Sequence, residues 1–197
     1  MSDLRVLVVI PTRGDRAEWL AEAKASVEKQ THKADEIVVV GCAEQKDVLC
    51  SVRLNKAIEA SQCDVFVLLS DDDLLLPSYI EKTVALMNKT RADIVWTDLL
   101  EFGGRRWADA NGYCRRVSAP VTALTKKSAW KKVGGYQEVP FLDWDFNWAM
   151  RDKGLKDVGL HEPLFLYRVH SGQDRKANEG NQTAIQFIRS RHHSKFP

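Results

Sequence analysis

Cysteine is scarce in this chain, and the few cysteines follow no spacing that predicts a metal site or a redox motif. Cys42, Cys50, Cys63 and Cys114 stand at irregular intervals, and no two of them form a C-x-x-C pair. A zinc site and a thioredoxin-type motif are therefore not indicated. We expect the cysteines to be reduced thiols packed in the core of a cytoplasmic protein.

The chain also lacks an excess of charge of one sign and a long apolar run. Its 197 residues carry a formal net charge of +2, which does not favour nucleic acid or a membrane surface as a partner. No run approaches the roughly 18 apolar residues that a membrane span needs, so we expect no transmembrane segment. The apolar segment "LRVLVVI" near the N-terminus is too short for a signal peptide, and no cleavage pattern of small residues follows it.

The first half of the chain alternates short apolar runs with amphipathic segments. The runs are rich in β-branched residues and predict buried strands at 5–10, 36–40, 65–69 and 93–96. Apolar residues with helical spacing predict helices over 17–30, 48–61 and 78–89. This order is typical of a parallel sheet with right-handed crossovers. We therefore predict the α/β class, with a Rossmann-like, mostly parallel sheet flanked by helices in a single domain.

The pattern is looser after residue 98. Residues 101–116 are polar and rich in turn formers, which predicts a loop or a hairpin. The other predicted elements are a strand to Thr125, a short helix over 128–133, a helix from about 143 to 153, a last strand beginning at 164 and a helix over 183–193.

Three adjacent carboxylates, Asp71, Asp72 and Asp73, follow the third predicted strand. Ligands of parallel sheets bind beyond the carboxyl ends of the strands, so these side chains lie where a ligand is expected. One aspartate there is explained by capping of the next helix, but a helix start does not satisfy three like charges. A divalent cation that prefers oxygen ligands does, which favours a metal site without excluding capping.

A second pair of carboxylates, Asp143 and Asp145, begins the amphipathic helix of "FLDWDFNWAM". Capping is the better interpretation for Asp145, whereas for Asp143 capping and a role as general base are balanced. A carboxylate beside tryptophans suits a general base, because partial burial raises a carboxyl pKa toward the working range. His170 in "YRVHSG" is, taken alone, more often structural than a metal ligand.

Taken in order, these pieces resemble glycosyltransferase family 2, the nucleotide-diphospho-sugar transferases with the GT-A fold. The resemblance covers about residues 4–172 and rests on "VVIPTRGDRAEWL", "LNKAIEASQCDVFVLLSDDDLLLP", "KKVGGYQEVPFLDWDFNWAMRDKG" and "YRVHSG". It implies a GT-A domain over 1–172, with a nucleotide-binding half at 1–98 and an acceptor and catalytic half at 99–172. Residues 173–197 are then a C-terminal tail with a short helix.

The resemblance also implies a reaction and roles for individual residues. The reaction is transfer of a sugar, with inversion, from a nucleotide-diphosphate sugar to a hydroxyl acceptor, a saccharide or another compound. A UDP-sugar is the first expectation for the donor. Asp72 is expected to bind Mn²⁺ or Mg²⁺ with help from Asp71 and His170, and Asp143 to act as general base. The expected nucleotide contacts are Pro11, Thr12, Arg13, Arg53, Asn55, Ser70 and Asp71.

The chain departs from the family pattern at three places, one of which is Leu54, where the family often has an arginine and where Arg53 stands one place away. Gly41 and Cys42 stand where the family has acidic residues that contact the base, which leaves the base open. Leu142 replaces the glutamate that precedes the general base. These departures motivate an alternative, a degenerate domain that binds a sugar nucleotide without turnover. A nucleotidyltransferase is a further alternative, although "PTRGDRAEW" is a poor match to the Gly-rich basic loop of such enzymes.

Overall fold

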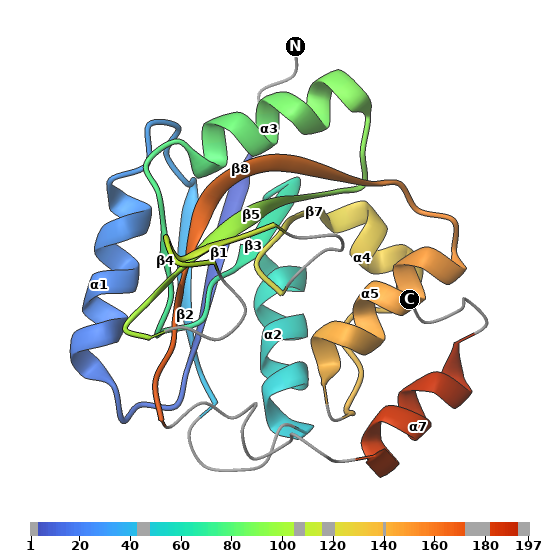
Figure 1. The fold of residues 1–197 in the computed structure, drawn as a ribbon. Helices are drawn as coiled ribbons and strands as arrows, with labels where there is room; N and C mark the ends of the chain where they lie inside the picture. The colour runs from blue at the N-terminus through green and yellow to red at the C-terminus, as the bar shows by residue number, and fades with distance from the viewer. Residues whose placement is uncertain are drawn as a thin grey trace.

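One mixed sheet with helices on both faces organises the chain (Figure 1). The computed structural model describes residues 4–42, 48–104, 109–115, 121–139, 141–171 and 182–192. Within them the strands are β1 (Val6–Thr12), β2 (Glu36–Gly41), β3 (Val65–Leu68), β4 (Leu74–Leu75), β5 (Ile94–Phe102), β6 (Tyr113–Cys114), β7 (Leu124–Lys126) and β8 (Asp157–Arg168). Their order is β2-β1-β3-β7-β5-β8-β4, and β6 pairs with β5 beside this row.

The helices form two layers around the sheet. They are α1 (Ala17–Glu28), α2 (Val48–Ala60), α3 (Tyr79–Thr90), α4 (Lys127–Val133), α5 (Leu142–Asp152) and α7 (Gln182–Arg191). Buried side chains of α1 and α3 share one core with the sheet, and those of α2, α4 and α5 share a second core on the opposite face. The predicted α/β class is therefore confirmed. Within the described ranges, no helix is long and apolar enough to cross a membrane.

The parallel pairs of the sheet are β1 with β2, β1 with β3, and β5 with β8. β1 pairs parallel with both β2 and β3, as the alternation of strands and helices predicts. β7 inserts antiparallel between β3 and β5, so the fourth predicted strand is not a direct neighbour of the third. β5 and β8 pair in parallel, whereas β4 and β6 pair antiparallel with their neighbours. "Mostly parallel" therefore describes the first half better than the second.

Burial follows the position of each strand in the sheet. β1 and β3 are central and covered on both faces, and their residues Val6–Ile10 and Val65–Leu68 are buried as predicted. β2 is an edge strand, and the side chains of Ile37 and Val39 are exposed. The prediction of a second fully buried strand is therefore wrong, because the described residues leave one face of β2 partly uncovered.

The expectation of reduced cysteines is wrong for one pair. Cys42, directly after β2, forms a disulfide with Cys50 in α2. The spacing of the cysteines does not indicate this pair. The two residues meet only because the fold places the end of β2 beside the start of α2. Cys63 and Cys114 take no part in the disulfide. Burial, with a hydrogen bond to Glu36, raises the pKa of the Cys63 thiol to about 12.

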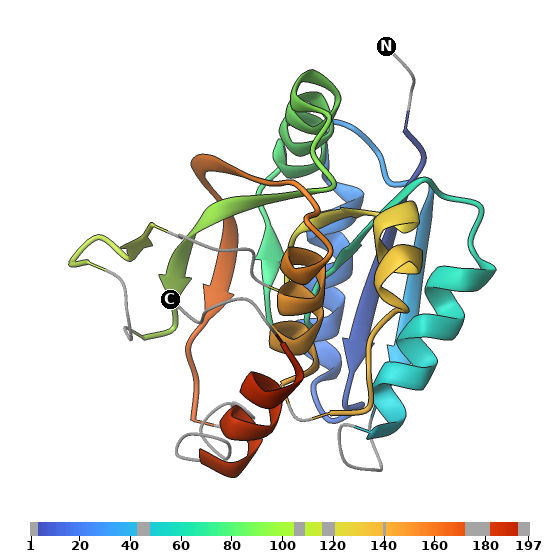
Figure 2. The ribbon, with the colours of Figure 1, turned by 90° about the vertical axis from the view of Figure 1, so that its right-hand side faces the viewer.

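The predicted C-terminal helix packs against α5 (Figure 2). Asp145 of α5 is only 1% exposed, and it accepts a hydrogen bond from Arg191 Nε at 2.8 Å. His192 Nε2 lies 2.9 Å from the same carboxylate, and Ile188 of α7 is buried. The capping interpretation of Asp145 is therefore wrong, since this carboxylate instead contacts Arg191 and His192 and anchors the end of α7.

Candidate functional site

The carboxyl ends of β1 and β3 bring two loops together. β1 and β3 run parallel and in register from Val6 opposite Val65 to Val9 opposite Leu68. The loop after β1 therefore lies beside the turn that follows β3, which contains the three aspartates. The predicted meeting of these segments at one edge of the sheet is found in the structure.

Asp71 is buried where the loop after β1 meets the turn after β3, with 3% of its surface exposed. Thr12 Oγ1 donates a hydrogen bond of 2.6 Å to Asp71 Oδ2, and the backbone N–H of Arg13 lies 3.4 Å from the same oxygen. Arg16 Nη1 lies 3.5 Å from Asp71 Oδ1. The structure thus brings Thr12, Arg13 and Asp71 into contact with one another, and their contact with a nucleotide stays a prediction.

Asp72 joins residues that are far apart in the sequence. Its Oδ2 lies 2.9 Å from His170 Nε2, across a separation of 98 residues. The same oxygen accepts a hydrogen bond of 2.8 Å from Arg16 Nη1. His170 reaches this position because β8 ends just before it and pairs with β4, which directly follows the aspartate turn. The pair predicted to bind a metal is therefore assembled.

Asp73 has a different environment. It is 3% exposed, and its Oδ1 accepts a hydrogen bond of 2.8 Å from the backbone N–H of Arg168 at the end of β8. Its own N–H donates to Ser70 O at 3.1 Å and closes the turn. Asp73 thereby fixes the end of β8, two residues before His170. Two of the three carboxylates, Asp71 and Asp72, share a positive charge that the protein itself supplies, the Arg16 guanidinium.

Trp19, in the first turn of α1, contacts the basic side chains that surround the aspartate turn. The Arg168 guanidinium lies 4.8 Å from the Trp19 ring centroid and 4.4 Å from that of Phe102. The Arg16 guanidinium lies 5.5 Å from Trp19, and the His170 ring lies 4.8 Å from it. Sequence reasoning missed Arg16 and Trp19. Their position directly after the "PTR" loop, within one helical turn of each other, was the available signal.

Asn55 holds a turn of the other half of the domain. Its Nδ2 donates to Tyr136 O at 2.7 Å, and its Oδ1 accepts from the Tyr136 N–H at 2.9 Å and from Trp130 Nε1 at 3.2 Å. These bonds fix the turn at Gly134 and Gly135 against α2. A direct contact between Asn55 and a nucleotide stays a prediction.

The other expected nucleotide contacts lie around the same edge. Arg53 Nη1 donates to Gly41 O and ties α2 to the end of β2. Pro11 lies in β1 with its side chain half-buried, and Arg13 is exposed and pairs with Asp15 at 3.2 Å. These positions border the site, but their contact with a ligand stays a prediction.

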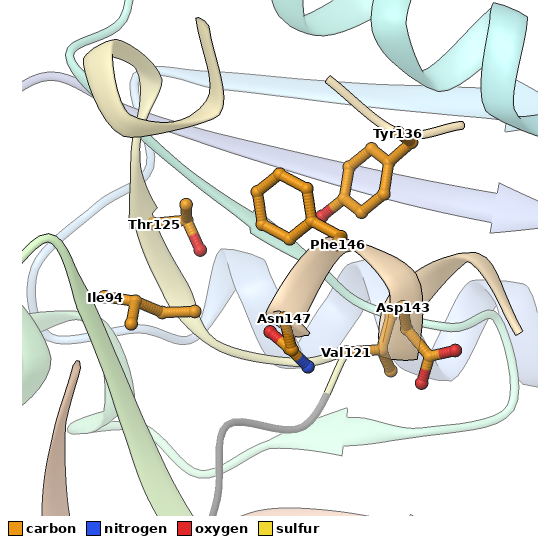
Figure 3. Close-up of a pocket in the computed structure, with 7 residues that line it drawn as sticks. All are labelled: Ile94, Val121, Thr125, Tyr136, Asp143, Phe146 and Asn147. Atoms are coloured by element: carbon orange, nitrogen blue, oxygen red, sulfur yellow. The ribbon is translucent and has the colours of Figure 1, made fainter. Parts of the chain in front are cut away.

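Asp143 lies on the opposite side of the sheet from α1, in the first turn of α5. It borders a small pocket that is lined by Ile94, Val121, Thr125, Tyr136, Asp143, Phe146 and Asn147 (Figure 3). Burial raises the pKa of the Tyr136 hydroxyl, and the negative charge of Asp143 adds to this shift. Tyr136 therefore stays protonated, and Asp143 is the acidic group available at this pocket. Its role as general base stays a prediction.

The donor set at Asp72 suits a cation that brings ligands of its own. In the part of the chain that the structure describes, no group of three or more His, Cys, Asp or Glu residues is arranged to hold a metal ion. Asp72 and His170 nevertheless offer a carboxylate oxygen and an imidazole nitrogen in contact with each other. Mg²⁺ commonly uses one or two protein carboxylates and completes its shell with substrate phosphates and water. The residues therefore fit a metal ion that binds together with a diphosphate.

Comparison with known proteins identifies a family and a fold. Residues 44–159 match the family model described as Glycosyl transferase family 2. No curated protein matches the chain. The structure resembles residues 1–349 of S. aureus TarS in complex with UDP-GlcNAc, with a TM-score of 0.72, 13% identity, and coverage of 94% of this chain and 65% of that one.

A second similar structure is the mannosyltransferase PcManGT from Pyrobaculum calidifontis in complex with GDP-Man and Mn²⁺. Its TM-score is 0.70 at 13% identity, with coverage of 100% of this chain and 67% of that one. The chain spans 39% of the length of the longer TarS structure. At these identities the likeness shows the fold, which confirms the predicted GT-A architecture.

Proposed function

Since the chain belongs to glycosyl transferase family 2, we propose that it transfers a sugar from a nucleotide-diphosphate sugar to a hydroxyl acceptor. The observation that carries this proposal is the contact between Asp72 and His170, 2.9 Å apart, at the carboxyl ends of the strands. The neighbouring contact of Thr12 with Asp71 gives the same edge of the sheet a preformed loop for the nucleotide. This edge is where ligands of open α/β sheets bind.

The proposed donor is a UDP- or GDP-sugar. Two structural neighbours are recorded with UDP-GlcNAc and with GDP-Man, so both bases occur among proteins of this fold. Gly41 at the end of β2 and Cys42 directly after it stand where the family has acidic residues. We propose Pro11, Thr12 and Arg13 as neighbours of the base.

Asp72 and His170 are the proposed ligands of Mn²⁺ or Mg²⁺. A metal ion held there would neutralise the charge that develops on the leaving diphosphate. Asp71 keeps the loop after β1 in place through Thr12, and Asp73 keeps His170 in place through the end of β8. The chain thus divides its three aspartates between ligand binding and positioning.

Asp143 is the proposed general base of an inverting transfer. It would accept the proton of the acceptor hydroxyl as that oxygen attacks the anomeric carbon, while the diphosphate leaves with the bonding electrons. A positioned base contributes about 10²–10⁴ in rate. Asp143 is half-buried at the rim of the apolar pocket, which offers the acceptor a surface beside the base.

A domain that binds a sugar nucleotide without turnover is the second candidate function. Leu142 stands where the family has a glutamate, and from the first turn of α5 it packs against the core instead of supporting Asp143 with a charge. Turnover therefore has to be measured separately from binding. Release of pyrophosphate from a nucleoside triphosphate would instead favour a nucleotidyltransferase.

The test is release of the nucleoside diphosphate from UDP-GlcNAc and from GDP-Man, with Mn²⁺ and a panel of saccharide acceptors. We expect Asp143→Asn to lower the turnover rate by about 10²–10⁴ and to change donor affinity little. Glu138→Gln is a matched control, because it removes an exposed carboxylate five residues away in sequence. Donor binding with no turnover by the wild type, or turnover unchanged in Asp143→Asn, would contradict the proposed role.

A further inference from the structure

Arg16 occupies a position between the two aspartates that face the proposed donor site. Its Nη1 lies 2.8 Å from Asp72 Oδ2 and 3.5 Å from Asp71 Oδ1, and only 12% of its side chain is exposed. Arg16 directly precedes α1, where the Trp19 ring lies 5.5 Å from its guanidinium. A single cation therefore pairs with both carboxylates and offsets part of their negative charge.

The contact of Arg16 with Asp72 involves the oxygen that would bind the metal. Asp72 Oδ2 accepts from Arg16 and also lies 2.9 Å from His170 Nε2. A divalent cation on this oxygen would stand within about 5 Å of the guanidinium, and like charges at that distance repel strongly in a partly buried site. Metal binding at Asp72 therefore requires Arg16 to move.

Arg168, the second cation of the cluster, is fixed in place. Its Nε donates to Asp72 O at 2.8 Å, its Nη2 pairs with Glu22, and its guanidinium lies between the rings of Trp19 and Phe102. Arg16 differs from Arg168 in its partners, because its Nη1 pairs with the Asp71 and Asp72 carboxylates themselves, whereas Arg168 Nε donates to a backbone carbonyl. Arg16 is thus the cation of this pair whose partners change when a metal binds Asp72.

A diphosphate provides the new partner. Guanidinium groups bind phosphate oxygens bidentately and with charge assistance. We propose that Arg16 is an exchangeable counter-ion: it pairs with Asp71 and Asp72 until the donor binds, and then moves onto the diphosphate as the metal takes its place at Asp72. This inference rests on the proposed function, and it makes Arg16 the residue that couples metal binding to diphosphate binding.

The exchange predicts an unusual effect of removing Arg16. Arg16→Gln should bind Mn²⁺ more tightly than the wild type when no nucleotide is present, because the competing cation is gone. The same variant should bind UDP or GDP more weakly in EDTA, because the diphosphate loses a guanidinium. A structural role for Arg16 alone would weaken both equilibria together.

The experiment is isothermal titration of the full chain with MnCl₂, alone and with saturating UDP or GDP, and with each nucleotide in EDTA. For the wild type we expect Mn²⁺ to bind at least about 10-fold more tightly with the nucleotide, within the usual range of coupling between sites. Arg16→Gln should gain about 5- to 10-fold in affinity for Mn²⁺ alone and lose a similar factor of coupling.

Two further variants keep the test decisive. Lys24→Gln removes an exposed positive charge from the same helix and should behave as the wild type. Arg16→Lys keeps the charge without the planar fork, so its affinity for Mn²⁺ alone should stay as low as that of the wild type. This variant is the second test where Arg16→Gln is poorly folded. Mn²⁺ affinity in Arg16→Gln that is undetectable, unchanged or lower than in the wild type overturns the exchange. A wild type that binds neither nucleotide with Mn²⁺ overturns the proposed function as well, so the two failures are distinguishable.

Discussion

Asp73→Ala tests whether the third aspartate is a structural residue and not a metal ligand. Asp73 is 3% exposed and accepts a hydrogen bond of 2.8 Å from the backbone N–H of Arg168. Hydrogen bonds to a charged group contribute about 1.5–3 kcal/mol, and the variant would leave a backbone donor without its partner. We therefore expect the free energy of unfolding to fall by about 2–3 kcal/mol.

Asp72→Asn should show the opposite pattern. Asp72 is more exposed, with 14% of its side chain accessible, and asparagine keeps an oxygen that accepts from Arg16. Because asparagine keeps this hydrogen bond and loses only the charge, we expect a loss of stability of about 1 kcal/mol, less than in Asp73→Ala. Metal-dependent nucleotide binding, in contrast, should be lost. The two substitutions thus separate stability from ligand binding within one turn.

Urea unfolding followed by tryptophan fluorescence measures both effects, provided that the m-values of the variants agree. Asp73→Asn is the matched control, since its amide oxygen retains an acceptor for the Arg168 N–H and should recover part of the loss. An Asp73→Ala protein within about 0.5 kcal/mol of the wild type would refute the structural role. An Asp72→Asn protein that loses as much as Asp73→Ala would refute the division of roles.

Three other predictions concern the support of the site. Gly135→Ala should lower stability by about 1–3 kcal/mol, measured by urea unfolding, because Gly135 has a φ of +74° and a Cβ there would lie 2.8 Å from Asn55 Oδ1. Burial raises the pKa of Cys63 from 9.0 to about 12. Between these pH values the unfolded chain loses a proton that the folded chain keeps, so the free energy of unfolding falls as the pH rises from 9 toward 12. Cys63→Ala should make this fall less steep, and an unchanged slope would contradict the prediction. Arg191→Met should lower the melting temperature, because it removes a partner of the buried Asp145 carboxylate, and an unchanged value would show that α7 is not anchored there.

The order of the first elements was predictable because each carries its own periodicity. Apolar runs such as 5–10 and 65–69 predict central strands, and the helices between them have recognisable apolar stripes. The insertion of β7 between β3 and β5 was not predictable, because strand order depends on pairing across the chain and not on local pattern. β4, with two residues, is too short to produce a pattern.

The site was predictable only where a motif or a resemblance marked it. The aspartate turn is recognisable as three adjacent charges, and the family resemblance predicted that His170, near the far end of the sequence, lies beside it. Arg16 is one of two arginines in a short polar loop, and its contact with Asp72 spans 56 residues. The Cys42–Cys50 disulfide was missed for a similar reason, since its spacing matches no framework and only the fold joins the two residues.

The central claim is that Asp72, together with His170, holds a metal ion for a nucleoside diphosphate at the carboxyl ends of the strands. The most direct measurement is the melting temperature of the wild type and of Asp72→Asn with UDP or GDP, each in Mn²⁺ and in EDTA. A ligand at 100 times its Kd stabilises the folded state by about 2.7 kcal/mol, which such a scan detects. We predict a rise that needs both Mn²⁺ and one nucleotide and is absent in Asp72→Asn. No rise with either nucleotide, or an equal rise in Asp72→Asn, would contradict the account.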